Sequence, residues 1–426
     1  MHSEQNGNPP GELAAAEAVG SAANGRARDA GPGREEGEAG VEEFTRRLKQ
    51  RALELGFSAC GACPAVEAAR FDKLRQWITQ GFAGAMHYIE RRLDAYRHPQ
   101  GVLPGVRSLL MLVHHYGSNP TSTPPAGYGR VARYAWGCRD YHDVIREKLH
   151  KLVEWVKHER PGTWARGVVD TAPLLERDYA QLAGLGWIGK NTLLLRTGEG
   201  SYFFLAALLM DCPLVYDQPY QSDHCGTCRA CLDACPTQAF VEPYVMDATR
   251  CISYLTIELR EMIPEALRAA VGDWVFGCDV CQEVCPWNRR SKPPDDPAYF
   301  PVTDLAPLEL TGLFDLDEEQ FRRRFGHTPL ARAGRAGLLR NAAIVLGNQR
   351  AEAARPALEK GLHDPSPLVR AASAWALGQL TGEKARRALA VRLSQETDPQ
   401  VLEEIERALA GWPTAPEQEV GRPASD

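Results

Sequence analysis

The sequence has no run of about 18 apolar residues, which a membrane-spanning helix would need. Its N-terminus lacks the succession of basic, apolar and small residues typical of a secretory signal, and no twin-arginine motif opens the chain. Neither sign of charge is in large excess, because 49 Lys and Arg stand against 55 Asp and Glu. We therefore expect a cytoplasmic protein without a membrane contact, in which any basic surface for a polyanion is local.

The first 40 residues contain almost no large apolar side chains and are rich in Gly, Ala and Glu. Such a segment cannot bury enough apolar surface to offset the entropy lost on ordering. We therefore expect residues 1–40 to form a disordered tail. The rest of the 426-residue chain is long enough for two or three domains, each with its own core.

Residues 41–215 mix two kinds of apolar pattern. Helical spacing alternates with short apolar runs that are typical of buried strands. The expected helices are 41–55, 71–80 and 141–159, and the expected strands are 108–113, 166–170 and 201–210. This mixture indicates an α/β or α+β domain.

Cysteine is concentrated in one region, since eight of the 12 cysteines lie between residues 225 and 285. The first motif reads Cys-x2-Cys-x2-Cys-x3-Cys-Pro from Cys225, and the second ends in Cys-x2-Cys-x3-Cys-Pro from Cys278. In two-cluster ferredoxins the cysteine that precedes proline ligates the other cluster. We therefore expect a ferredoxin-like domain over residues 216–300 with two [4Fe–4S] clusters. One cluster is expected on Cys225, Cys228, Cys231 and Cys285, and the other on Cys235, Cys251, Cys278 and Cys281.

Zinc is the alternative ligand for paired Cys-x2-Cys units, but two interleaved motifs that end in Cys-Pro favour iron–sulfur clusters. The other four cysteines carry a weaker signal. Cys60 and Cys63 have no helix N-terminus behind them to activate a thiolate. We interpret them as buried or incidental thiols, with a redox or metal role as the alternative, and we interpret Cys138 and Cys212 as structural.

The proline-rich residues 291–297 predict a loop or linker at the exit of the cysteine-rich region. Residues 301–426 are expected to form a linker followed by helical repeats. The segment 338–347 is echoed at 368–378 and more weakly at 401–411, and the terminal glycines recur about every 31 to 33 residues. This pattern predicts a HEAT-like module with a short period, and a plain helical bundle is the alternative. Seven arginines and no acidic residue lie between Phe321 and Arg350. They predict a basic stripe suited to a nucleic-acid backbone, or else a solvated basic face.

Iron–sulfur clusters transfer single electrons, so bond breaking needs a second cofactor or an acid–base partner. Asp170, at the end of an expected strand, is the candidate acid, and a turn or helix-capping Asp is the alternative. The glycines of segment 184–191 have GxGxxG spacing, but no strand precedes them, so we exclude a dinucleotide site. The polar stretch of Arg133, Tyr134 and residues 140–142 is either a contact to a phosphate or base or a solvated face.

These motifs, in this order, resemble the epoxyqueuosine reductase family over about residues 41–412. The resemblance rests on residues 168–173, 175–177, 184–191 and 251–258, the doubled cysteine motif and the helical tail. It implies a cobalamin-dependent oxidoreductase, related to reductive dehalogenases, that reduces epoxyqueuosine to queuosine at the wobble position of tRNA. This reaction is the last step of queuosine biosynthesis. The implied fold is α+β, with a nitroreductase-like cobalamin-binding catalytic domain over residues 41–215.

The same resemblance implies roles for single residues. Asp170 resembles the family's proton donor, and the helical tail with its arginine-rich run resembles the part that grips tRNA. The stretches implied to line the cobalamin or substrate pocket contain Arg133, Asp170, Arg177, Lys190, Asn191, Ser253, Asp279 and Val280. We also expect a monomer that takes electrons from an external donor.

One familiar cobalamin signature, Asp-x-His-x-x-Gly, is absent, because the segment that starts at Asp140 lacks its glycine. We therefore expect no histidine ligand to cobalt. Three alternative functions are a reductive dehalogenase, a non-enzymatic electron carrier and a HEAT-like scaffold with an iron–sulfur structural core. A repeat tail for gripping tRNA has no purpose in the first, and the large N-terminal domain has none in the second.

Overall fold

The computed structural model describes residues 37–117, 123–380 and 382–410. The expected tail over residues 1–40 lies outside this part except for its last residues, which already belong to helix α1 (Glu38–Glu54). This helix starts three residues before the predicted one and ends one residue earlier. No helix in the described ranges has the length and apolar character needed to cross a bilayer.

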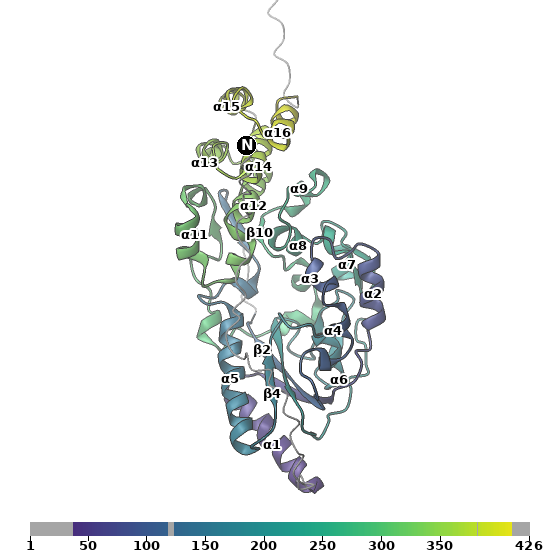
Figure 1. Ribbon diagram of the computed structural model, residues 1–426. Coiled ribbons are helices and arrows are strands. Elements are labelled where there is room, and N and C mark those ends of the chain that lie inside the picture. Colours follow the sequence, from purple (N-terminus) through teal and green to yellow (C-terminus); the bar gives the residue numbers. More distant parts are fainter. Residues whose placement is uncertain (1–36, 118–122, 381, 411–426) are drawn as a thin grey trace, which may run out of the picture.

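A four-stranded antiparallel sheet forms the centre of the N-terminal region, with strand order β1-β2-β7-β4 (Figure 1). All three predicted strands are present, and β1 was not predicted because its Cys, Gly and Ala side chains give no strand signal. The strands are β1 (Ala59–Pro64), β2 (Ser108–His115), β4 (Ala165–Val168) and β7 (Phe203–Met210). The predicted helices 71–80 and 141–159 correspond to α2 and α5. The helices around the sheet are α2 (Phe71–Thr79), α3 (His87–Glu90), α4 (Leu93–Arg97), α5 (Tyr141–Glu159) and α6 (Glu176–Leu182).

Alternation along the central strands explains the layers. In β2, Leu110 and Leu112 face the side covered by α1 and α5, whereas Leu109 and Met111 face the side covered by α2 and α6. Because successive strand residues point to opposite faces, an unbroken apolar run fills both cores at once. The sheet is therefore the middle layer of three (Figure 1).

A second, small sheet joins the three regions that the sequence separates. Its strand order is β10-β3-β11, with β3 parallel to β10 and antiparallel to β11. The strands are β3 (Tyr128–Val131), β10 (Trp274–Phe276) and β11 (Leu308–Glu309). Each strand comes from a different one of the three expected regions, so backbone hydrogen bonds link the N-terminal, cysteine-rich and C-terminal parts directly.

The cysteine-rich region consists of short elements, as expected where thiol ligands rather than a large core organise the chain. A hairpin of β5 and β6 packs beside it. The elements are β5 (Trp187–Ile188), β6 (Leu194–Leu195), α7 (Ala230–Asp233), β8 (Phe240–Glu242), β9 (Val245–Met246), α8 (Ile252–Ile257), α9 (Glu265–Val271) and α10 (Val280–Glu283).

The loop expected as a linker over residues 291–297 packs firmly against the N-terminal region. Asp296 lies 3.2 Å from Lys148 Nζ and 3.5 Å from His114 Nε2. Tyr299, which follows it, is buried in the core beneath α5. We call residues 291–297 the strap, because the ion pair of Asp296 and the buried ring of Tyr299 hold this loop against the N-terminal region. The prolines indicated a loop, but they did not indicate these contacts.

The C-terminal region is a stack of helices, which confirms the predicted HEAT-like repeats (Figure 1). The three echoed segments correspond to α12, α14 and α16, and α13 and α15 lie between them in the chain. The helices are α11 (Glu318–Phe325), α12 (Gly334–Asn348), α13 (Arg355–Gly361), α14 (Pro367–Gln379), α15 (Glu383–Leu393) and α16 (Pro399–Ala410). Gly347 and Gly378 repeat because an added Cβ would lie within 3 Å of Trp375 and of Ala408, respectively, on the next helix.

Buried polar side chains join this stack to the cysteine-rich region. Arg340 donates to the carbonyls of Leu255, Leu259 and Glu261. Asn341 donates to the carbonyls of Thr256 and Val275. The last carbonyls of a helix have no partner within it, so α12 supplies the donors that the end of α8 lacks.

Candidate functional site

Asp170 lies two residues beyond β4 in a left-handed backbone conformation with φ of 54°. This conformation is strained for a residue other than glycine, and such strain is found where side chains are held for function. The backbone N–H of Asp170 donates to Glu176 Oε1 at 2.8 Å. The start of α6 therefore helps to hold the loop.

Two neighbours on α5 hold the carboxylate of Asp170. The Tyr141 hydroxyl donates to Oδ2, and His142 Nε2 lies 3.3 Å from the same oxygen. The other ring nitrogen of His142 lies 2.7 Å from Asp140 Oδ1. Asp140 caps α5, and Tyr141 stacks on Phe204 with ring centroids 4.1 Å apart. The residues that the sequence suggested as a phosphate contact or a solvated face thus position Asp170.

The charges of this group follow from these contacts. Burial opposes ionisation of Asp170, but the interactions with His142 and Tyr141 outweigh it and lower its pKa. Burial also opposes the charged form of His142, whereas Asp140 and Asp170 favour that form and raise its pKa to about 9. Burial and the nearby charge of Asp170 raise the pKa of Glu176. Asp170 and His142 are therefore an ion pair at neutral pH, and Glu176 is the first of the two carboxylates to take up a proton.

The group lies in a recess that solvent reaches, and we call this recess the cavity of Asp170. The side chain of Asp170 is 49% exposed and Arg177 is also exposed. Nevertheless burial opposes ionisation of Asp170 and lowers the pKa of Arg177. Groups that water reaches although protein surrounds them lie on the wall of a cavity rather than on the outer surface. Arg177 donates to the Thr192 carbonyl at 2.9 Å, which fixes its direction on that wall.

The cysteines form two groups, and each matches one predicted ligand set. Burial raises the pKa of Cys231 to about 11, and Cys285, Cys225 and Cys228 add to this effect. These four thiols surround a space of about 220 Å³. The space is also lined by Lys190, Asn191, Leu195, His224, Ala230, Pro286 and Trp287.

The second group lies deeper. Burial raises the pKa of Cys278, and Cys251 and Cys235 add to it. Cys281 is affected by burial first and then by Cys278 and Cys251. In the described ranges no three His, Cys, Asp or Glu side chains converge closely enough for one metal ion.

The glycine-rich segment 184–191 is the β5–β6 hairpin and not a helix N-terminus, which agrees with the exclusion of a dinucleotide site. A Cβ on Gly186 would lie 2.0 Å from the Leu195 carbonyl, so close approach of the two strands requires glycine. At the tip, Lys190 Nζ donates to the carbonyls of Gly226 and Cys228. Asn191 is buried, and its Nδ2 has no partner. Both residues therefore lie at the first thiol group.

The remaining predicted pocket residues lie near the second thiol group. Burial raises the pKa of Cys251, and the backbone N–H groups of Tyr254 and Ser253 oppose this effect. Asp279 is buried and accepts from the backbone N–H of Arg133 at 2.8 Å and from its guanidinium at 3.0 Å. Val280 begins α10 beside them. Arg133 and Asp279 are thus paired with each other, whereas Asp170 and Arg177 line the open cavity.

Three segments match known protein families. Residues 97–171 match Epoxyqueuosine reductase QueG, DUF1730, residues 224–288 match a 4Fe-4S double cluster binding domain, and residues 330–410 match HEAT repeats. The epoxyqueuosine reductase of Escherichia coli strain K12 is 39% identical over 378 residues, which cover 87% of this chain and 97% of that protein. The epoxyqueuosine reductase of Pseudomonas aeruginosa is 44% identical over 345 residues, which cover 78% and 94%.

The chain belongs to the epoxyqueuosine reductase family.

Solved structures agree. The crystal structure of an epoxyqueuosine reductase with a tRNA-Tyr epoxyqueuosine-modified stem loop has a TM-score of 0.82 at 31% identity, covering 87% of this chain and 98% of that one. The Bacillus subtilis epoxyqueuosine reductase, with an aspartate-bearing catalytic loop swung out of the active site, has a TM-score of 0.82 at 30% identity, covering 87% and 99%. The protein is an oxidoreductase of this family, and the predicted α+β fold with a two-cluster domain and HEAT-like repeats is confirmed.

Cys60 and Cys63, in contrast, do not form a joint site. They lie on β1, and their side chains contact the cores on opposite faces of the sheet. Burial raises the pKa of Cys60 to about 11 and that of Cys63 to about 12. Cys63 is buried and Cys60 is half-buried in the strand, which agrees with the interpretation from sequence.

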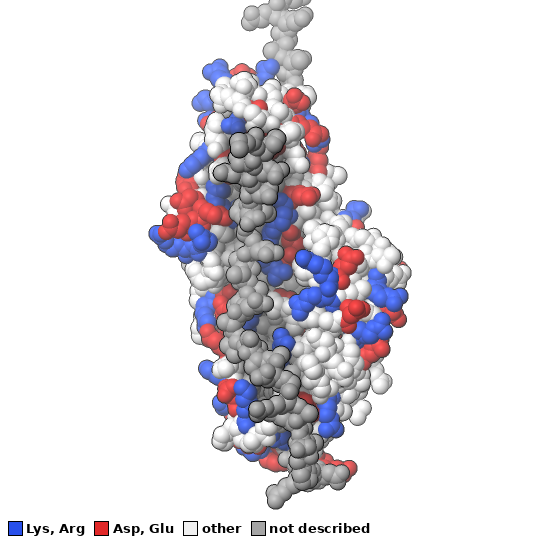
Figure 2. All heavy atoms as spheres, viewed as in Figure 1, with Lys and Arg blue, Asp and Glu red and all other residues white. Residues whose placement is uncertain are grey.

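The arginine-rich run does not form one continuous basic stripe. Arg340 is fully buried and Arg335 pairs with Asp364, so neither presents a free charge. Arg323 on α11 pairs with Glu319, and Figure 2 shows acidic and basic side chains interleaved at this edge. Periodicity alone could not show which of these arginines face the interior.

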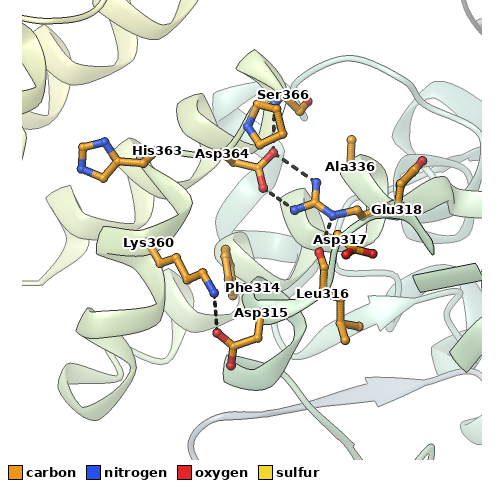
Figure 3. Close-up of a pocket in the computed structure, with 12 residues that line it drawn as sticks. Phe314, Asp315, Leu316, Asp317, Glu318, Ala336, Lys360, His363, Asp364 and Ser366 are labelled. Atoms are coloured by element: carbon orange, nitrogen blue, oxygen red, sulfur yellow. Dashed lines mark hydrogen bonds and ion pairs between the residues drawn. The ribbon is translucent and has the colours of Figure 1, made fainter. Parts of the chain in front are cut away.

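A hollow of about 560 Å³ in the C-terminal stack also lacks a free charge suited to a phosphate. It lies between the α11 N-terminus and the start of α14. Arg335 faces Asp364 across it, and Lys360 pairs with Asp315 at 2.6 Å (Figure 3). Both pairs neutralise their cations, so this hollow is not part of the candidate site.

Sequence reasoning did not assign three residues, Tyr88, Glu258 and Arg332, to the cavity. Burial raises the pKa of Tyr88, on α3, to about 12, and the charges of Glu258, Arg332 and Asp170 also act on this pKa. Glu258 pairs with Arg332, 74 residues away in the chain. Glu258 lies in a motif that supported the family resemblance, and Arg332 lies in the arginine-rich run. Neither pattern places them together, because only the packing of α8 against the C-terminal stack does so.

Proposed function

We propose that this protein reduces epoxyqueuosine to queuosine in tRNA, with cobalamin held in the cavity around Asp170. Two [4Fe–4S] clusters, one on each thiol group, would supply electrons that come from an external donor. The protein would act as a monomer. The observation that carries the proposal is Asp170, held in a strained loop by Tyr141, His142 and Glu176 on the wall of an open cavity. The proposed regions are residues 41–215 for catalysis, 216–300 for the clusters and 301–426 for tRNA.

The residues present fit both cofactors. The thiol sets, the space of about 220 Å³ and the unpartnered Nδ2 of Asn191 suit a cluster whose sulfur atoms accept hydrogen bonds. Arg177 and Asp170 offer polar groups on an open wall, as a large cofactor with amide side chains requires. Cobalamin, when bound, supplies a strongly reducing cobalt centre for cleavage of the epoxide C–O bond.

The two thiol groups differ in access. Cys228 is exposed, whereas burial dominates the pKa of Cys251 and Cys281 in the second group. The first group therefore faces an external electron donor, and the second faces the interior of the protein.

The protein residues deliver the protons. Converting an epoxide to an alkene and water takes two electrons and two protons. When substrate fills the cavity, water is excluded from Asp170, which raises its pKa and favours proton transfer from His142 at 3.3 Å. Asp170 then protonates the epoxide oxygen as a general acid. After His142 takes up another proton from solvent, the same pair delivers the second proton, with which the oxygen leaves as water. Asp140, on the other side of the His142 ring, stabilises the imidazolium between turnovers.

Anaerobic turnover of the reconstituted protein on tRNA that carries epoxyqueuosine tests this proposal. Digested nucleosides would be analysed by mass spectrometry, with and without added cobalamin. Conversion to queuosine that depends on cobalamin is the expected result. A protein with both clusters and bound cobalamin that converts no epoxyqueuosine would contradict it.

A further inference from the structure

Arg332 comes from the C-terminal region but is held at the cysteine-rich one. It lies in the 3-10 turn η7 (Pro329–Ala333), just before α12. Its Nε donates to Glu258 Oε1 at 2.8 Å, and Glu258 directly follows α8. Arg260 donates to the carbonyls of Arg332 and Ala333 at 2.5 and 2.9 Å. The turn is therefore fixed on both its backbone and its side chain.

Hydrogen bonds link the Arg332–Glu258 pair to the loop that carries Asp170. The link is segment 85–92, which includes α3. The backbone N–H of Ala85 donates to the Tyr254 hydroxyl on α8 at 2.7 Å, and Arg92 donates to the carbonyl of Thr171, the residue after Asp170, at 3.2 Å. The charge of Arg332 is also among the causes that lower the pKa of Asp170. Arg332 and Asp170 therefore lie near the same segment, between α3, the end of α8 and η7.

The terminal nitrogens of Arg332 are available to a ligand. Glu258 accepts only from Nε, and within the described ranges neither terminal nitrogen has a hydrogen-bond partner. The side chain is 41% exposed, in contrast to Arg340, which is fully buried. Glu258 thus orients the guanidinium and leaves its two outer N–H edges open. A planar fork of this kind binds two oxygens of one phosphate.

The surroundings explain why a cation is needed there. Asp170 and Glu258 place carboxylates around the cavity, and these would repel a nucleic-acid backbone that enters it. Arg332 is the arginine of the run 321–350 that combines exposure, a fixed direction and a place at the cavity.

We propose that Arg332 binds a backbone phosphate next to the wobble nucleotide and so positions the modified base over Asp170. This inference rests on the proposed function and deepens it. Arg332 is a positioning residue, because it holds the substrate backbone and takes no part in bond cleavage. The C-terminal region would then contribute to the active site itself in addition to holding the tRNA outside it.

Variants of Arg332 in the full-length, reconstituted protein test this role. Arg332→Met should raise the KM for tRNA about 10- to 100-fold, with a much smaller change in kcat, because a charge-assisted contact to substrate is lost. The slope of log(kcat/KM) against log[salt] should fall by about 1. Arg332→Lys should recover part of the affinity but not the bidentate geometry.

The matched control is Arg46→Met, on α1 and outside the region proposed for tRNA, where the side chain is 68% exposed and paired with Glu43. Its KM and salt slope should equal those of the wild type. Equilibrium binding of unmodified tRNA, measured by fluorescence anisotropy, gives a readout without turnover, and iron content checks that the clusters are intact.

Two outcomes would overturn the inference. An unchanged KM, binding constant and salt slope in Arg332→Met would show that no phosphate contact exists. A fall in kcat alone would assign Arg332 to the chemistry of Asp170 instead. Failure of the proposed function is a separate result: wild-type protein would then convert no epoxyqueuosine, while the binding assay would still report on Arg332.

Discussion

The two thiol groups and the Asp170 cavity are assembled in opposite ways. Seven of the eight cluster-region cysteines come from two short segments, Cys225–Cys235 and Cys278–Cys285. The cavity takes Tyr88, Asp170, Glu258 and Arg332 from four distant segments. Ligand spacing is a local property that sequence records, whereas a cavity wall depends on how elements pack. Variants in the thiol groups, in the cavity and at the contact between the C-terminal and cysteine-rich regions test this contrast.

The largest effect is expected for Cys285→Ala. Cys285 is grouped with three thiols that precede it by more than 50 residues, so its loss should remove one cluster and abolish turnover. Iron content should fall by about half, from about eight per chain. The control variant Cys138→Ala, which changes an exposed cysteine outside both thiol groups, should have the iron content of the wild type. Full iron content in Cys285→Ala would contradict the proposal that Cys285 of the second motif ligates the cluster of the first motif.

Asp170→Asn addresses the cavity. It keeps the shape of the side chain but removes the acid, so kcat should fall about 100- to 10,000-fold while iron content stays unchanged. The control Asp143→Asn alters an exposed carboxylate on α5 that pairs only with Arg146, and should retain full turnover. If Asp170→Asn turns over at the wild-type rate, Asp170 is not the acid.

Asn341→Leu tests the joint between the two regions. Asn341 bonds the carbonyls of Thr256 and Val275 and accepts from Arg340, all in a buried site. The variant leaves these groups without partners, so the free energy of unfolding should fall by about 2–4 kcal/mol in denaturant titration.

The exposed Gln400 on α16, changed to Leu, provides the control and should alter stability by less than about 0.5 kcal/mol. Equal stability of Asn341→Leu and wild type would mean that the C-terminal stack is only loosely attached. Truncation before α12 is a poor test of tRNA binding, because it would also uncover the apolar core that α12 shares with β10.

The smallest effect is expected for His142→Gln and depends on pH. The folded-state pKa of His142 is raised from 6.5 to about 9, so its ion pairs stabilise the protein fully below pH 6.5 and lose this effect as pH rises through 9. The variant should be about 1–3 kcal/mol less stable at pH 6. This difference should disappear near pH 10.

Urea unfolding at the two pH values measures this, with His158→Gln as the control, since His158 is 86% exposed. A destabilisation of His142→Gln that is independent of pH would point to packing and not to the ion pairs with Asp140 and Asp170.

Sequence reasoning predicted the elements better than their contacts. The bounds of α5 match the predicted helix, because its apolar residues recur at helical spacing from Val144 to Val156. The strap over residues 291–297 was expected only as a linker, because nothing in its prolines records the buried Tyr299 that anchors it. Asp170 was found as a candidate acid, but its partners Tyr141 and His142 were not, since they are 28 and more residues away.

By itself, the sequence determined the cysteine grouping, the mixture of strands and helices in residues 41–215 and the helical repeats, because each of these is encoded in short-range spacing. Only the tertiary structure decided the fate of the arginines between residues 321 and 350. Arg340 and Arg332 are eight positions apart and chemically identical, yet one is buried against the carbonyls of α8 and the other is exposed at the cavity. Burial depends on which face of α12 meets the cysteine-rich region, and that is a property of packing between elements and not of residue type.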